Sequence, residues 1–209
     1  MSSVYNRIAG QSLERLAAIS DGIFGVAMTL LVLDVRVPTT DAIHSEGDLG
    51  RAILVLLPKL LTYLMSFLTA GIFWIGQQTQ LNHLEKGSRH LVWINIAFLF
   101  AVSMLPFSTA LLSEFIHYRG AILVYWANIF ALGFLLLASW QYAEHAGLVR
   151  EEHRERVGKA IRQRILISQA LYAVAAALCF IDTYVSIVLI VLLQVIYALG
   201  PGRSEKSRE

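Results

Sequence analysis

Residues 15–34 read RLAAISDGIFGVAMTLLVLD, a stretch with a polar start, a long apolar run and one carboxylate near the beginning of that run. A helix needs about 20 mostly apolar residues to cross the hydrocarbon core of a bilayer. The segment 16–37 meets this length, and Asp21 then lies about one turn inside the membrane. Charged groups inside a membrane are costly and normally face protein or water. Asp21 is therefore the first candidate functional residue.

Further segments have the same length and apolar character, at 52–78, 91–113, 121–143, 162–181 and 183–199. These runs are long and rich in Leu and Ala, whereas a membrane β-barrel would show short segments of alternating polarity. The sequence therefore predicts an all-α membrane protein with six transmembrane helices, forming one transmembrane domain over 1–209. Pro58 and Pro106 fall inside predicted spans and are expected to kink those helices.

The composition of the 209 residues excludes several other classes. Hydrophobic residues make up 56% and charged residues 15%, against roughly 45–50% and 25% in soluble domains. The net charge of +2 offers no broad basic face for nucleic acid. The single cysteine, Cys179, excludes an internal disulfide and any multi-cysteine metal site. The histidines follow no catalytic or metal-binding spacing, so we expect neither an enzyme nor a cofactor.

Basic residues gather on one side of the predicted bundle. With six spans both termini share a side, and thirteen of the 17 Lys and Arg residues lie there, with three on the opposite side and Lys59 inside the second span. Cytoplasmic loops carry such an excess, so we expect a multi-pass protein of the cell membrane with both termini, the connector 144–161 and the tail 200–209 in the cytoplasm. The thirteen are Arg7, Arg15, Lys86, Arg89, Arg150, Arg154, Arg156, Lys159, Arg162, Arg164, Arg203, Lys206 and Arg208, against Arg36, Arg51 and Arg119.

Asp21 needs polar partners from other helices. Arg15 is six residues away, about 120° around the helix, so the two side chains do not pair on their own helix. In the predicted topology the end of the second span and the start of the third lie at the same depth. A polar cluster in the cytoplasmic half is therefore predicted, either fixing helix packing or taking part in conduction. The available residues are Trp74, Gln77, Gln78, His83, His90 and Asn95.

The first span also carries an apolar stripe. Val26, Leu30, Leu33 and Val37 follow i, i+4, i+7, i+11 spacing, and Thr29 lies beside them. Spacing alone does not separate a stripe that faces lipid from one that packs against protein or lines a pore.

The same stretch resembles a family signature. Arg15-x-x-x-Ile19-Ser20-Asp21, followed by GIFGVAMTLLVLD, is similar to R-x-x-x-F-S-D-G-x-F-A-I-A-x-T-L-L-V-L. This signature belongs to the prokaryotic homologues of the endolysosomal potassium channel known as transmembrane protein 175. Trp74, Asn95 and the segment 104–107 add weaker support, and the last third of the chain resembles the family mainly in hydropathy.

The resemblance implies a potassium-permeable cation channel without a P-loop filter. In it, four chains assemble as a homotetramer, and the first helix of each lines a passive pore at the common axis. The narrow hydrophobic gate falls five residues after the motif Asp, at Val26, where isoleucine is common in the family. Potassium is the permeant ion, and a threonine layer at Thr29 favours it over sodium. The implied pore-lining residues are Val26, Thr29, Leu30 and Leu33; the implied inter-helix polar network holds Arg15, Ser20, Asp21, Trp74 and Asn95.

Two other functions compete with a channel. A secondary transporter or proton-coupled carrier would use Asp21, but the sequence has neither visible inverted halves nor paired broken helices. A membrane enzyme ranks third, because the scattered histidines suit loops better than a catalytic site.

Overall fold

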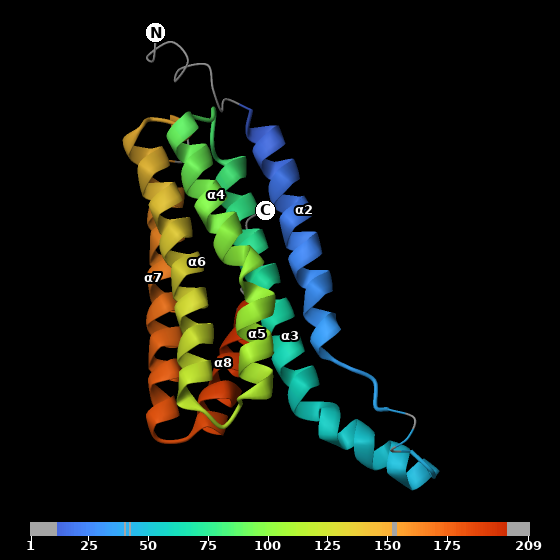
Figure 1. Ribbon diagram of the computed structural model, residues 1–209. Helices are drawn as coiled ribbons and strands as arrows, with labels where there is room; N and C mark the ends of the chain where they lie inside the picture. Colours follow the sequence, from blue (N-terminus) through green and yellow to red (C-terminus); the bar gives the residue numbers. More distant parts are fainter. Residues whose placement is uncertain (1–11, 40, 42, 152–153, 200–209) are drawn as a thin grey trace, which may run out of the picture.

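The computed structural model describes residues 12–39, 41, 43–151 and 154–199, and within these ranges the regular structure is helical apart from one isolated bridge (Figure 1). Arg7 and the predicted tail 200–209, with Arg203, Lys206 and Arg208, lie outside the described residues. The helices are α2 (Leu13–Leu30) with η1 (Leu31–Asp34), α3 (Glu46–Asn82), α4 (Arg89–Ser103), α5 (Leu105–Glu114), α6 (Arg119–His145), α7 (Arg154–Ala177) with η4 (Leu178–Phe180), and α8 (Thr183–Leu199).

The helices match the predicted membrane spans. Five helical rods are long and apolar enough to cross a bilayer: Leu13–Asp34, Glu46–Asn82, Arg89–Glu114, Arg119–His145 and Arg156–Phe180. The sixth, α8, has 17 residues and is about 26 Å long, slightly less than the roughly 30 Å hydrocarbon core. A bilayer accommodates such a helix by thinning locally at modest cost. The prediction of an all-α protein with six spans is confirmed.

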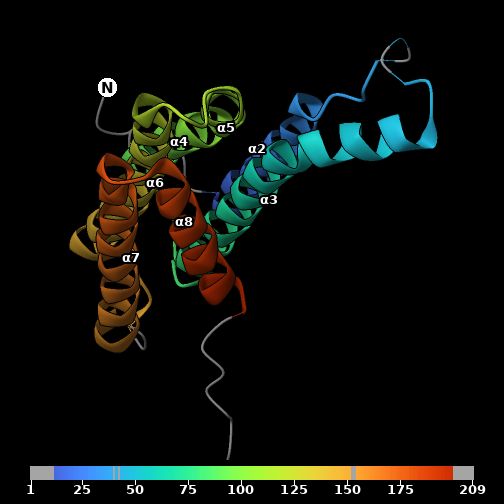
Figure 2. The ribbon, with the colours of Figure 1, turned by 90° about the horizontal axis from the view of Figure 1, so that it is seen from below.

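The helices run up and down in a bundle with α6 near its centre. Ile122, Tyr125, Ile129 and Leu132 of α6 are all completely buried, and they follow i, i+3, i+7, i+10 spacing along one face. Figure 1 places α2 at one edge of the bundle and α7 at the other, and Figure 2 shows α7 and α8 on the side away from α2. Because lipid is as apolar as a protein core, packing and hydrogen bonds rather than hydrophobic burial hold such helices together.

The predicted third span, 91–113, is two helices joined at a break. α4 ends at Ser103 and α5 begins at Leu105. Pro106 has no N–H to donate to the carbonyl four residues earlier, at Val102, so the helical hydrogen bonding is interrupted at this depth. Asn128 of α6 bridges the break. Its Nδ2 donates at 2.9 Å to the Ala101 carbonyl, which also accepts from the Met104 amide at 3.3 Å, and its Oδ1 accepts from the Ser108 hydroxyl at 3.3 Å.

Asn128→Leu is therefore expected to destabilise the break. The change removes both contacts and leaves the Ala101 carbonyl without that donor, which costs about 1 kcal/mol between membrane helices. The thermal midpoint of the detergent-purified protein should fall by about 2–4 °C, measured by tryptophan fluorescence. Phe134→Leu alters an exposed side chain of the same helix and serves as the control. Equal midpoints for the two variants would contradict this role of Asn128.

Helices extend beyond the apolar runs at two places, because hydropathy marks where side chains turn polar and not where helices end. The connector 144–161 is mostly helical: α6 continues to His145 and α7 begins at Arg154. α3 has 37 residues and is about 55 Å long, well beyond the predicted 52–78. Pro58 lies inside α3, and Figure 1 shows the first turns of this helix bending away from the bundle.

Two turns at one end of the bundle bind each other through their backbones. Leu84 and Val149 form an antiparallel bridge, the Glu85 amide donates to the Leu148 carbonyl at 2.8 Å, and the Arg150 amide donates to the His83 carbonyl at 3.1 Å. We call this contact the loop clasp. Its buried side chains form a small apolar cluster that also includes Leu16 of α2. The α3–α4 turn, the α6–α7 turn and the start of α2 are thus held together.

Candidate functional site

α2 has one buried face and one exposed face. The exposed fractions are 58% for Val26, 45% for Leu30 and 68% for Leu33, and Thr29 is exposed beside them. The four residues predicted to line a pore thus share the outer face of a helix at the edge of the bundle (Figure 1). The residues that pack inward are Leu16, Ser20, Phe24 and Ala27.

The Thr29 hydroxyl is oriented by its own helix. Its Oγ1 lies 3.0 Å from the Gly25 carbonyl and 2.9 Å from the Val26 carbonyl. A hydroxyl has a single hydrogen, and here it donates that hydrogen back to the backbone. The oxygen lone pairs are consequently free to accept from water or to contact a cation on the exposed side of α2.

An open apolar groove runs between α2 and α4. The α2 wall includes Val26, and Gly22 contributes no side chain: a Cβ added there would meet nothing within 4 Å. The groove therefore offers space and apolar surface, but no charged group. Its lining residues are Ile19, Gly22, Ile23, Val26, Ala27 and Leu30 of α2, and Ile96, Leu99, Phe100 and Ser103 of α4.

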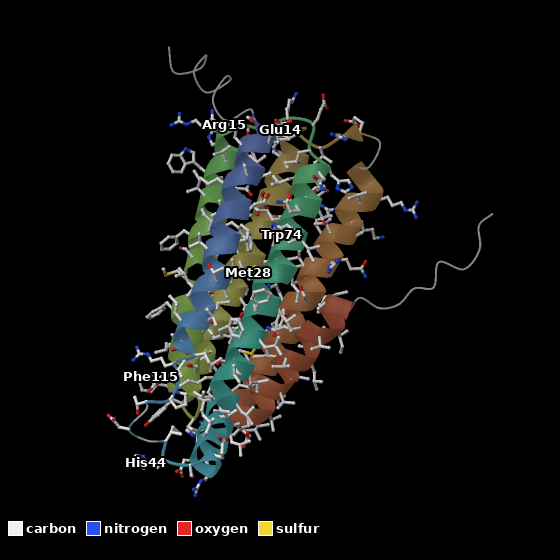
Figure 3. The ribbon with its side chains drawn as sticks, turned by 90° about the vertical axis from the view of Figure 1, so that its right-hand side faces the viewer. Glu14, Arg15, Met28, His44, Trp74 and Phe115 are labelled. Atoms are coloured by element: carbon white, nitrogen blue, oxygen red, sulfur yellow. The ribbon has the colours of Figure 1, made fainter. Side chains whose placement is uncertain are left out.

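Asp21 is bound to α3 through two donors. The Trp74 indole Nε1 and the Gln78 Nε2 each donate to the Asp21 Oδ1 at 2.7 Å. Figure 3 shows Trp74 on α3 directly beside α2. Two short bonds to a charged acceptor offset part of the cost of holding a carboxylate in the membrane.

A second set of polar side chains crosses the interior at about the same level. Gln77 donates through Nε2 to the Ser20 hydroxyl at 3.2 Å and to the Asn95 Oδ1 at 3.0 Å. Asn95 in turn donates to the Ser139 hydroxyl at 3.1 Å. All four side chains are buried, and they join α2, α3, α4 and α6. We call the Asp21 contacts and this chain together the α2 polar network.

Of the residues assigned to a polar network from the sequence, the structure brings together Ser20, Asp21, Trp74 and Asn95. Arg15 lies apart, exposed at the start of α2 (Figure 3), and its guanidinium makes no hydrogen bond or ion pair with any described residue. Gln77 and Gln78 were noted as available partners and prove central. Ser139 was missed, because a lone serine in an apolar run carries no distinctive pattern.

A further buried polar cluster was not anticipated. The Tyr125 hydroxyl lies 3.0 Å from the Thr69 Oγ1 and 3.3 Å from the Ser66 Oγ. Thr109 donates to Ser66 at 2.6 Å, and Gln194 donates to Thr69 at 2.6 Å. This cluster joins α3, α5, α6 and α8. The signal was present as polar residues inside predicted spans, but Ser and Thr there often bond only to their own backbone.

Proteins named as ion channels are similar to this chain in sequence. The family model of the endosomal/lysosomal potassium channel TMEM175 matches residues 15–106. A potassium channel of Chamaesiphon minutus is 31% identical over 190 residues, which cover 88% of this chain and 93% of that protein. The endosomal/lysosomal proton channel TMEM175 of Homo sapiens is 28% identical over 188 residues, 82% of this chain and 36% of that one.

The fold agrees with a solved structure. The crystal structure of a lysosomal potassium-selective channel TMEM175 homolog from Chamaesiphon minutus superposes with a TM-score of 0.79 at 28% identity, over 90% of this chain and 96% of that one. The sequence likeness runs almost from end to end of a relative that is more than 30% identical. The chain therefore belongs to the TMEM175 family.

Proposed function

We propose that this chain is one subunit of a potassium-permeable cation channel in which four α2 helices surround a passive pore. The observation that carries the proposal is the exposed outer face of α2, with Val26, Thr29 and Leu33 in one stripe. Family membership supports it, since relatives of similar length from Chamaesiphon minutus and Streptomyces collinus are named potassium channels.

Oligomerisation follows from the number of pore helices. Each chain supplies a single α2, and one helix cannot enclose a passage, so copies must gather around an axis. A symmetric assembly would cover the apolar groove between α2 and α4 with a helix of the neighbouring subunit. It would also bring the exposed Arg15 close to other protomers. Four copies is the number that the family resemblance implies.

The proposed gate is a ring of Val26 side chains. A narrow apolar ring excludes water and blocks ions, and a small expansion wets it and lets a cation through. Potassium preference would come from the next layer, where four Thr29 oxygens replace part of the hydration shell without a carbonyl filter. The α2 polar network fixes α2 against α3 and α4, and so sets the position of both layers.

We place both termini in the cytoplasm of a cell-membrane protein. The loop clasp and the start of α2 share one end of the bundle (Figure 1). Lys86, Arg89, Arg150 and Arg156 lie at or near that end, and cytoplasmic loops carry such an excess of basic residues.

Planar bilayer recording of the purified protein under a potassium gradient tests the proposal. Unitary steps that reverse near the potassium equilibrium potential are the expected result. A carrier using Asp21 would instead give slow, saturable, proton-dependent flux without steps. Because the human relative is named a proton channel, a second recording under a pH gradient with potassium equal on both sides checks which ion carries the current.

Thr29→Val should reduce the preference for potassium over sodium while leaving the pore open. Valine keeps the shape of threonine but removes the oxygen that faces the exposed side of α2. The permeability ratio, measured from the reversal potential with potassium and sodium on opposite sides, should fall toward one. Thr79→Val is the matched control, because Thr79 is also exposed and bonded to a carbonyl of its own helix, at 2.7 Å from Ile75. An unchanged ratio in Thr29→Val would remove Thr29 from the ion path.

A further inference from the structure

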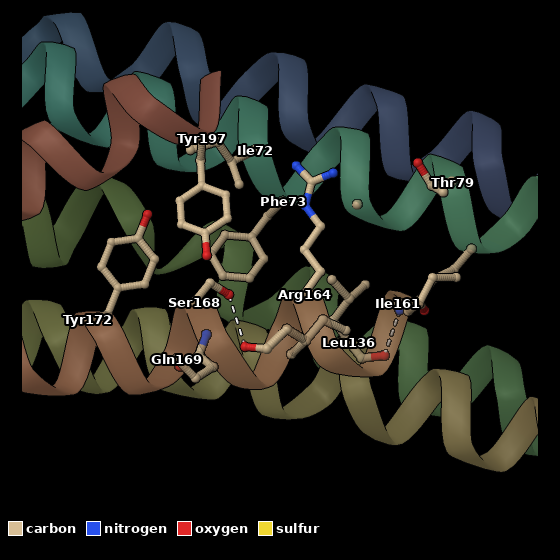
Figure 4. A pocket seen from close by; sticks show the side chains of 13 residues that line it. Ile72, Phe73, Thr79, Leu136, Ile161, Arg164, Ser168, Gln169, Tyr172 and Tyr197 are labelled. Atoms are coloured by element: carbon tan, nitrogen blue, oxygen red, sulfur yellow. Dashed lines mark hydrogen bonds between the residues drawn. The ribbon is translucent and has the colours of Figure 1, made fainter. Parts of the chain in front are cut away.

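A narrow crevice opens between α3, α6, α7 and the end of α8, away from α2. Its cavity volume is about 70 Å³, and one side is open to the surroundings. Its walls are mostly apolar and include Phe73, Leu136 and Tyr172, with Thr79, Ser168 and Gln169 among the polar lining residues. Figure 4 shows the Arg164 side chain extending from α7 toward α3, with Tyr197 of α8 beside it and Tyr172 further along the crevice.

Arg164 supplies a positive charge that has no negative partner among the described residues. Its guanidinium carbon lies 6.0 Å from the centre of the Tyr197 ring. No carboxylate of the described residues forms an ion pair with it, whereas Arg162, two residues earlier, pairs with Glu144 at 3.2 Å. A cation at the rim of an apolar crevice is complementary to a ligand with one anionic end and one apolar end.

The wall also holds one buried side-chain oxygen that has no hydrogen-bond partner among the described residues. Gln169 donates through Nε2 to the Ile129 carbonyl at 3.3 Å, but its Oε1 is buried and accepts no hydrogen bond from the described part of the chain. This oxygen is suited to a hydroxyl or ester-linked glycerol group, which a purely aliphatic ligand would not provide.

The position of the crevice across the membrane suits a lipid, because it spans the headgroup level and the acyl-chain level. Arg164 is near the start of the predicted span 162–181, and Tyr197 is near the end of α8. Arg and Tyr at span ends typically lie at the level of the lipid headgroups. Tyr172 is eight residues further along α7, about 12 Å deeper. One end of the crevice thus meets headgroups, and the other meets acyl chains.

We infer that this crevice binds an anionic phospholipid of the cytoplasmic leaflet, with its phosphate on Arg164 and one acyl chain along Phe73, Leu136 and Tyr172. The inference uses the proposed orientation of the chain but not ion conduction, so it stands or falls separately from the proposed channel activity.

Native mass spectrometry of the purified protein tests the site, with palmitoyl-oleoyl phosphatidylglycerol and the corresponding phosphatidylcholine as probes. The wild type should retain phosphatidylglycerol preferentially, and Arg164→Gln should lower that preference about fivefold, the effect of one basic residue at an anionic surface. Arg156→Gln removes one charge from an exposed residue of the same helix outside the crevice and should retain the preference. Equal preference in Arg164→Gln and the wild type would overturn the inference.

Two further variants separate charge from shape. Arg164→Lys keeps the charge and should restore most of the preference, so a loss in Arg164→Gln cannot be ascribed to misfolding. Ser168→Leu adds an apolar side chain to the crevice wall and should reduce retention of both lipids while Arg164 remains in place. Glycerol 3-phosphate at the same concentration should leave retention unchanged, since it has no acyl chain. Displacement of the lipid by this compound would overturn the assignment to a phospholipid.

Discussion

Replacing Val26 with alanine is expected to raise the unitary potassium conductance about tenfold, which corresponds to a barrier lowered by about 1.4 kcal/mol. Valine closes the proposed gate by excluding water from a narrow apolar ring, and alanine widens the ring and lets water enter at lower cost. Single-channel recording in planar bilayers with equal potassium on both sides measures the change directly. The reversal potential under a sodium–potassium gradient should move little, because the Thr29 layer is intact.

A matched control comes from a valine on another helix. Val124 of α6 is 41% exposed, against 58% for Val26, and it belongs to a helix that is not proposed to line the pore. Val124→Ala should therefore leave conductance unchanged. If Val26→Ala behaves like Val124→Ala, the gate lies elsewhere on α2, and Leu30 and Leu33 become the next positions to truncate.

Asn95→Leu is expected to give the largest loss of stability in the bundle. Asn95 is 2% exposed and bonds to Gln77, Ser139 and the Leu91 carbonyl, so the change leaves several buried polar atoms without partners. Gln77 is affected most, because its Oε1 already has no partner among the described residues. An unsatisfied buried group costs about 1–3 kcal/mol, and the thermal midpoint should fall by about 5 °C.

The control for Asn95→Leu is Gln141→Leu, which also converts an amide to leucine but at an exposed position of α6. A double-mutant cycle with Gln77→Leu adds a sharper measurement. If Asn95 and Gln77 act as one unit, the double variant should lose less stability than the sum of the two single losses. Additive losses would mean that the two amides stabilise the bundle independently.

Much of the fold was predictable because membrane spans have a simple physical signature. Backbone groups in lipid must be satisfied within a helix, so length and apolarity locate each span. The same reasoning could not place the break at Met104, since Pro106 alone does not tell whether a helix bends or stops. Asn128, 22 residues beyond Pro106, bonds across the break and reaches it only in the folded bundle.

The candidate site was predictable where a single helix carries the information. The stripe of Val26, Thr29 and Leu33 follows from helical spacing, and the need of Asp21 for partners follows from the cost of a charge in lipid. The choice among those partners was not predictable. Helical geometry excluded Arg15 as a partner on the same helix, but it did not tell which residues of α3 would bind the carboxylate; in the protomer Trp74 and Gln78 donate to it.

The loop clasp has a consequence for biogenesis. Its two halves, around Leu84 and Val149, are more than 60 residues apart, and a ribosome makes the earlier half first. The backbone groups of the α3–α4 turn therefore have no partner in the α6–α7 turn while α4, α5 and α6 are being inserted. The backbone bonds of the loop clasp form only after Arg150 has been synthesised, so a chain truncated before that point lacks this link between the α3–α4 turn and the α6–α7 turn.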